Sequence, residues 1–186
     1  MPVLDIRVLG DPVLRQETRP VAAVTNELRK LIDDMFETMH AAKGIGLAAP
    51  QIGRLERIAV VDVDGGRQPI VLVNPEIVSV AGNAKAEEGC LSIPDVFGDV
   101  ERPADVVVRA LDREGKPFEM PASELLARCF QHEIDHLHGK LFIDYLSVLK
   151  RRSALAKWSK EKERYPNFIR RLTPDEVAEH HHAEDL

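Results

Sequence analysis

Apolar residues recur every three or four positions in three segments of the chain, with charged residues between them. The segments cover residues 26–40, 123–139 and 148–164. This spacing is typical of helices with one buried face. Gly44 follows the first segment, Ser123 is a suitable N-cap for the second, and Pro166 follows the third. The pattern therefore predicts three helices.

Runs of β-branched residues lie between the first two of these helices. They cover residues 58–63, 70–75, 77–80, 106–111 and 117–120. Asp64-Gly65-Gly66 separates the first two runs, and a turn at residues 112–115 separates the last two. Strands joined by tight turns pair antiparallel, and the helices do not alternate with them. The predicted fold class is therefore α+β.

Length and composition fit one globular domain. The chain has 186 residues, of which 44% are hydrophobic and 30% charged, and no apolar run approaches the roughly 20 residues of a membrane-spanning helix. Asp5 and Arg7 interrupt the first ten residues, where a signal peptide needs an unbroken apolar stretch. Two cysteines cannot form a disulfide framework. We expect a cytoplasmic protein without a signal or transit peptide.

The segment 123–139 contains His132-Glu133-Ile134-Asp135-His136, a match to the metal-binding pattern H-E-x-x-H. At about 100° per residue, His132 and His136 lie about 40° apart on one helix face, so both rings can reach one ion. Glu133 shares their apolar side of the helix, where an unpaired carboxylate is costly. Core histidines satisfied by backbone partners would explain one His but not the set. The pattern favours a metal site.

A catalytic site of this kind needs a third protein ligand. Cys129 lies on the same face, but about 10 Å along the helix axis from His136, so it is better interpreted as a small buried hydrophobe. Cys90, within Glu87-Glu88-Gly89-Cys90-Leu91-Ser92-Ile93-Pro94, is the strongest other candidate. An inert buried thiol is the alternative interpretation of Cys90.

A loop of small residues, GIGLAAPQIG, runs from Gly44 to Gly53. It superficially matches a nucleotide-binding loop, but it follows a helix rather than a strand and lacks Gly-Lys-Ser/Thr. Such a loop suits a floor on which substrate backbone lies close. The amide N–H of Gln51 is a donor of the kind that stabilises an oxyanion.

Three segments in this order, GIGLAAPQIG, EGCLSIP and QHEIDHLHG, resemble the signature motifs of peptide deformylases, which remove the formyl group from nascent N-formylmethionyl chains. The resemblance covers about residues 1–165. It implies antiparallel sheets packed around a central metal-binding helix, with N-terminal and C-terminal helices. It also implies a catalytic domain over residues 1–165 and a flexible tail over residues 166–186, whose His180 to His182 carry no expected chemistry.

The resemblance implies a role for each matching residue. Cys90, His132 and His136 would bind one divalent metal, usually Fe²⁺ and replaceable by Ni²⁺, Co²⁺ or Zn²⁺. Glu133 would be the general base and acid, and the Gln51 amide and the Leu91 backbone N–H would hold the oxyanion. The residues expected to contact substrate or line its pocket are Gly46, Ile45, Leu125, Cys129 and His132, with Glu88 and Arg102 as a pair at the pocket wall.

Two features bear on partners and substrate preference. Residues 150–171, from Lys150 to Arg171, hold nine Lys or Arg against two Glu in a chain of net charge −6. C-terminal helices of some deformylases bind ribosomes, so we expect this segment to dock there; a solvated helix packed on the acidic body is the alternative. Ala86, Phe97 and Arg128 depart from the family pattern near the pocket.

Two other functions use the same residues. A peptidase could employ the H-E-x-x-H helix to cut internal amides, although the downstream third ligand usual in those enzymes is missing. A ribosome-associated binding protein could hold the metal for structure alone. Neither a membrane nor DNA is an expected partner.

Overall fold

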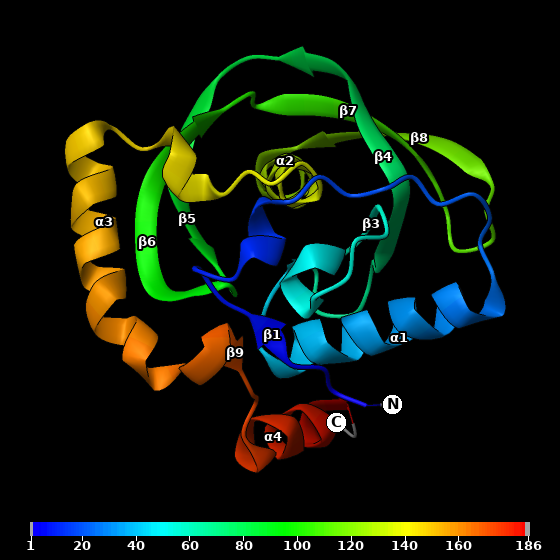
Figure 1. Ribbon diagram of the computed structural model, residues 1–186. Coiled ribbons are helices and arrows are strands. Elements are labelled where there is room, and N and C mark those ends of the chain that lie inside the picture. The colour runs from blue at the N-terminus through cyan, green and yellow to red at the C-terminus, as the bar shows by residue number, and fades with distance from the viewer. Residues whose placement is uncertain (1, 185–186) are drawn as a thin grey trace.

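The protein is described here by a computed structural model, which covers residues 2–184 and the side chains of residues 2–179. The described strands form three antiparallel sheets (Figure 1). The largest has the strand order β2-β3-β4-β7-β8. Its strands are β2 (Gly46–Ala48), β3 (Ile58–Val61), β4 (Ile70–Ala81), β7 (Asp105–Leu111) and β8 (Pro117–Ser123). The two smaller sheets pair β5 (Ala84–Cys90) with β6 (Ile93–Arg102), and β1 (Ile6–Arg7) with β9 (Ile169–Arg170).

The three predicted helices are present. They are α1 (Asn26–Ala41), α2 (Glu124–Leu137) and α3 (Val148–Glu161). The hydroxyl of Thr25 accepts a hydrogen bond from the Leu28 N–H at 3.1 Å and so caps α1. Ser123 occupies the N-cap position of α2, but its side chain makes no capping bond. No helix in the described part of the chain combines the length and hydropathy needed to cross a membrane.

Helix α2 packs against the large sheet. Figure 1 shows it end-on below the arch of β4 and β7, and it contacts β2, β3, β4, β7 and β8. Leu72 and Val108 of the sheet share a fully buried cluster with Phe130 and Leu137 of the helix. Each buried side chain of this size contributes about 1.5–3 kcal/mol through the apolar surface it removes from water. Burial of this face fixes which side of α2 carries its histidines.

Helices α3 and α1 each pack against strands of the protein. The indole of Trp158 on α3 packs with Val96 and Val100 of β6, and its N–H donates to the Leu9 carbonyl at 3.1 Å. Helix α1 covers β2 and β3 through a cluster that includes Ile32 and Met35. Helix α3 therefore holds β6 against the N-terminal segment that contains Leu9.

The sequence pattern misses the β5–β6 hairpin. The side chains of β5 are mostly exposed, and four of its seven residues are charged or Gly, so the segment lacks the apolar alternation that identifies strands. The pattern also predicts two short strands at residues 70–75 and 77–80, whereas β4 is one strand. Register shifts against β7, between Val73 and Glu76 and between Ile77 and Ser79, account for the interrupted pattern.

The sequence predicts a tail from residue 166, and the structure places much of that segment in regular elements. Strand β9 pairs with β1, and α4 (Pro174–Glu184) contacts α1. A reciprocal capping box starts α4: Thr173 N–H donates to Glu176 Oε2 at 2.7 Å, and Glu176 N–H donates to Thr173 Oγ1 at 3.3 Å. The side chains of His180 to His182 lie outside the described residues.

Candidate active site

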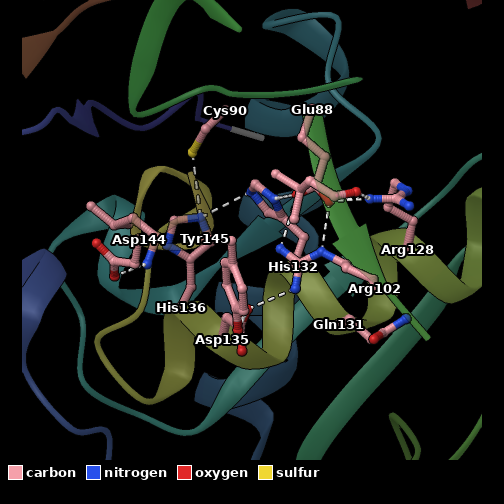
Figure 2. A network of polar contacts seen from close by, with 12 residues as sticks. Glu88, Cys90, Arg102, Arg128, Gln131, His132, Asp135, His136, Asp144 and Tyr145 are labelled. Carbon is pink, nitrogen blue, oxygen red and sulfur yellow. Dashed lines mark hydrogen bonds and ion pairs between the residues drawn. The ribbon is translucent and has the colours of Figure 1, made fainter. Parts of the chain in front are cut away.

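Three potential ligand atoms meet where α2 faces the end of β5. Nε2 of His136 lies 3.2 Å from Nε2 of His132 and 3.4 Å from Sγ of Cys90. Figure 2 shows the Cys90 thiol reaching from the hairpin toward the two rings on the helix. Among the described residues, these three form the one group of His, Cys or acidic side chains close enough to hold an ion, with all ligand atoms within 4.8 Å of one another.

Cys129 lies outside this group. Its side chain is buried, and its Sγ contacts the Ile45 carbonyl at 3.5 Å. Burial raises the pKa of this thiol well above its usual range. A thiol held neutral in this way is a poor metal ligand, since metals bind the thiolate.

The chemistry of the cluster fits a divalent metal. Burial lowers the pKa of His136 well below its usual range, which keeps the ring in the neutral form that metals bind. Burial also acts against charge on His132, but the neighbouring Cys90 and Glu88 outweigh it and hold the pKa of His132 high. A metal would compete with that proton.

Glu133 sits beside the cluster as an unpaired buried acid. Its side chain is almost fully buried, and its Oε2 has no hydrogen-bond partner among the described residues. Burial raises the pKa of this carboxyl to about 7. A carboxyl with such a pKa both accepts and releases a proton near neutral pH, as a general base and acid must.

Glu88 orients one of the histidines. Its Oε1 lies 2.9 Å from Nδ1 of His132, and both of its oxygens accept from Arg102, at 2.6 and 2.9 Å. Burial opposes ionisation of Glu88, but the hydrogen bonds of His132 and Arg102 outweigh it and lower its pKa to about 2. A charged carboxylate on Nδ1 fixes the ring so that Nε2 faces the other ligand atoms.

The same network joins β6, α2 and the segment that contains Tyr145 (Figure 2). Arg102 on β6 also pairs with Asp135 on α2 at 2.8 Å, and the Tyr145 hydroxyl donates to Asp135 at 2.7 Å. The Arg102 guanidinium lies 4.7 Å from the centre of the Tyr145 ring. Helix α2 is thereby locked to the hairpin that carries Cys90.

Arg128 is a member of this network that the sequence does not predict. Its guanidinium donates to Glu88 Oε2 at 2.6 Å and to the carbonyls of Val100 and Ala84, each at 2.9 Å. Only 11% of its side chain is exposed. The helical pattern places Arg128 on the polar side of α2, but the partners that bury it belong to the hairpin that the pattern misses.

Gln51 and Leu91 lie next to Cys90. The Gln51 side-chain oxygen accepts from the Ala48 N–H at 2.9 Å, and its Nε2 donates to Ser92 Oγ at 3.1 Å. The same Nε2 lies 3.6 Å from the Cys90 sulfur, a long contact that leaves this N–H available to another acceptor. These bonds fix a donor at the edge of the ligand cluster.

Gly46 leaves room for the Glu133 carboxylate. A side-chain carbon at this position would lie 2.5 Å from Glu133 Oε1 and 2.9 Å from the Cys129 sulfur. Only glycine therefore allows β2 to approach the helix this closely.

A cleft of about 930 Å³ opens onto the ligand atoms. Six of the residues predicted to contact substrate or line its pocket do line it: Ile45, Gly46, Glu88, Leu125, Cys129 and His132. Arg102, predicted to stand with Glu88 at the pocket wall, lies behind Glu88 and does not line the cleft. Ile45 and Leu125 are 40% and 51% exposed, which places them at its mouth. The sequence does not predict a second set of lining residues from the C-terminal segment: Arg164, Tyr165, Arg170, Arg171, Thr173 and Glu176.

The chain combines an H-E-x-x-H helix with an upstream cysteine on an α+β fold. This combination places it in the class of candidate metal-dependent hydrolases. Residues 3–152 match the family model described as polypeptide deformylase, and the chain belongs to this family. It is 54% identical over 168 residues to a peptide deformylase of Hydrogenovibrio crunogenus, a match that covers 90% of this chain and 99% of the relative.

Solved structures of peptide deformylases are similar to this chain. A peptide deformylase from Legionella pneumophila is 51% identical with a TM-score of 0.85, over 87% of this chain and 96% of that one. A peptide deformylase from Synechococcus elongatus in complex with actinonin is 47% identical with a TM-score of 0.82, over 86% of this chain and 89% of that one. The predicted α+β arrangement of antiparallel sheets and several helices is confirmed.

Proposed function

We propose that this protein hydrolyses the N-formyl group of N-formylmethionyl peptides and releases formate and a free N-terminus. The observation that carries the proposal is the unpaired buried carboxylate of Glu133, beside three ligand atoms at the floor of a cleft. The peptide deformylases reported above match most of the chain, which supports the same reaction.

Cys90, His132 and His136 would hold one divalent metal, and α2 would be the central metal-binding helix of the fold. The bound metal supplies Lewis acidity, which polarises the formyl carbonyl and eases deprotonation of water. Three protein ligands are typical of catalytic sites that keep a position for water or substrate. The family resemblance favours Fe²⁺, with Ni²⁺, Co²⁺ or Zn²⁺ as substitutes, because thiolate and imidazole donors accept each of them.

Glu133 moves the proton. It takes a proton from the attacking water and later delivers it to the amine that departs from the formyl carbon. Its burial supports both steps, because a carboxyl whose pKa is raised to about 7 both takes up and releases a proton near neutral pH.

Gln51 and Leu91 would stabilise the formyl oxygen of the substrate. The Gln51 Nε2 and the Leu91 backbone N–H would donate to the formyl oxygen as negative charge develops on it. The bonds of Gln51 to Ala48 and Ser92 hold its amide in place, so little reorganisation accompanies the reaction.

The first residue of the substrate would lie between β2 and α2. Ile45, Leu125 and Cys129 offer an apolar wall to a methionine side chain, and Gly46 lets substrate backbone come close. The formyl group is small, so a tight site at the ligand cluster would exclude bulkier acyl groups.

The basic segment from Lys150 to Arg171 is proposed to dock the enzyme on the ribosome, which would place its action in the cytoplasm. Arg152, Lys157 and Lys160 on α3 are exposed, while Trp158 anchors the helix to the body. Contacts between these cations and ribosomal RNA phosphates would gain affinity by releasing counterions.

The direct test is product analysis with formyl-Met-Ala-Ser, using enzyme purified without oxygen and analysed for metal. We expect formate and Met-Ala-Ser in equal amounts. Cleavage between amino acids without formate would overturn the proposal in favour of a peptidase. A metal-replete protein that turns over neither bond and shows a closed four-ligand spectrum would indicate a structural metal instead.

A further inference from the structure

The cleft continues beyond the pocket proposed for the first residue. Its volume of about 930 Å³ is near the upper end of small-molecule sites, roughly 300–1,000 Å³. A formylmethionine group is a small ligand on this scale, so a large part of the cleft is left for the rest of the peptide. The C-terminal segment contributes lining residues that include Arg164, Tyr165, Arg170, Thr173 and Glu176, which we call the distal wall.

The distal wall is attached to the oxyanion side of the cleft. Nη1 of Arg170 donates to the Leu91 carbonyl at 3.3 Å, and 17% of the Arg170 side chain is exposed. Nη2 of the same guanidinium lies 3.7 Å from Glu176 Oε1. The first turn of α4 is thereby linked to the residue after Cys90.

The wall is attached to the start of the GIGLAAPQIG loop as well. Nζ of Lys43, the residue before Gly44, pairs with Glu179 Oε2 at 2.8 Å. Glu176 and Glu179 are three residues apart and so share a face of α4. Helix α4 is therefore tied to Leu91 through Arg170 and to Lys43 through Glu179, and it lies against α1 (Figure 1).

This wall lies outside the family match, which ends at residue 152. Residues 164–179 are nevertheless ordered by their own interactions: the pairing of β9 with β1, the stacking of Tyr165 on Trp158 and the capping box of α4. The Lys43–Glu179 pair is exposed on both sides, at 72% and 64%, so it is a weak and replaceable attachment.

We propose that the distal wall is a binding surface for the peptide residues that follow the first, and that the Lys43–Glu179 pair positions it. The inference rests on the proposed deformylation. It makes the C-terminal segment a determinant of how the enzyme distinguishes long from short formylated substrates.

The test compares kcat/KM for formyl-Met-Ala-Ser-Ala with that for formyl-Met amide. Glu179→Lys and Lys43→Glu each place like charges together, and each should lower the long-to-short ratio by about two- to fivefold, the range expected for an exposed pair, chiefly through KM for the long peptide. The exchange variant Lys43→Glu/Glu179→Lys should restore the ratio. Asp175→Lys makes the same charge change on the same helix at a residue that does not itself line the cleft, and should keep the ratio.

An unchanged or increased ratio in both single variants would overturn the proposal, as would failure of the exchange variant to restore it while its melting temperature matches that of the parent. Absence of formate from both substrates with the parent enzyme would instead contradict the proposed function. The two failures are therefore distinguishable.

Discussion

At the scale of single residues, the chemistry depends on which side chains burial leaves without a partner. Glu88 and Glu133 are both buried acids near His132, but Glu88 is surrounded by arginines and Glu133 has an unpaired oxygen. Their pKa values accordingly lie at about 2 and about 7. Two carboxyls on neighbouring elements are thus assigned different roles, one as a fixed charge and one as a proton carrier.

The two cysteines should differ in the same way. Cys90→Ala should empty or strongly weaken the metal site, whereas Cys129→Ala should keep the metal and cost about 1 kcal/mol of stability, a typical value for a point substitution. Metal content and the thiolate–Co²⁺ absorption band would check this. Loss of metal from Cys129→Ala, together with a normal band in Cys90→Ala, would show that the ligand assignment is wrong.

At the scale of elements, the β5–β6 hairpin and α2 depend on each other. The hairpin supplies Cys90 and Glu88, and the helix supplies the histidines that they contact. Arg128 spans the gap, with bonds to Glu88 and to carbonyls of both strands. The geometry of the ligand cluster therefore depends on contacts between the hairpin and the helix.

Arg128→Met should weaken the contact between the β5–β6 hairpin and α2. It removes a charged hydrogen bond and leaves two backbone carbonyls without this donor, so we expect a loss of about 1.5–3 kcal/mol in the free energy of unfolding. Arg109→Met is the matched control, because Arg109 pairs with Glu76 and Glu119 on the surface and should change stability less than Arg128→Met does. Denaturant unfolding would compare the free energies of unfolding of the two variants. Equal losses of stability in both would contradict the role of Arg128 in joining the hairpin to α2.

The sequence predicts the elements whose pattern is periodic and the residues placed by one helix. Residues 132, 133 and 136 follow from helical geometry alone. Cys90 is the strongest remaining candidate on sequence, and the family resemblance assigns it as a ligand, since nothing local brings it to the helix. The β5 half of the hairpin escapes prediction because its side chains are largely exposed. The distal wall escapes because its position depends on long-range contacts, such as that of Arg170 with Leu91.

At the scale of the whole molecule, charge and packing separate the two ends of the C-terminal region. Helix α3 buries Ala154 and Trp158 against β6 and turns Arg152, Lys157 and Lys160 outward. The segment that follows returns to the cleft. One face of the protein is thus suited to an anionic partner and another to the substrate.

Docking on the ribosome should therefore depend on exposed charge rather than on the presence of α3. Because Trp158 is part of the core, removing the helix would disturb the fold, and reversing Arg152, Lys157 and Lys160 to Glu is the sharper change. Co-sedimentation with ribosomes should be lost, while formyl-tripeptide activity is kept. Binding by the parent that is unaffected between about 50 and 200 mM salt, or that survives the triple reversal, would rule out this dock.

The most direct test of the central claim is turnover by a metal-loaded Glu133→Gln variant. The substitution keeps the size of the side chain and all three proposed ligands, so metal content should match that of the parent protein. Formate release should fall by several orders of magnitude, because Glu133 serves two proton transfers that are each typically worth roughly 10²–10⁴-fold. Turnover near the parent rate by a fully loaded Glu133→Gln sample would contradict the account.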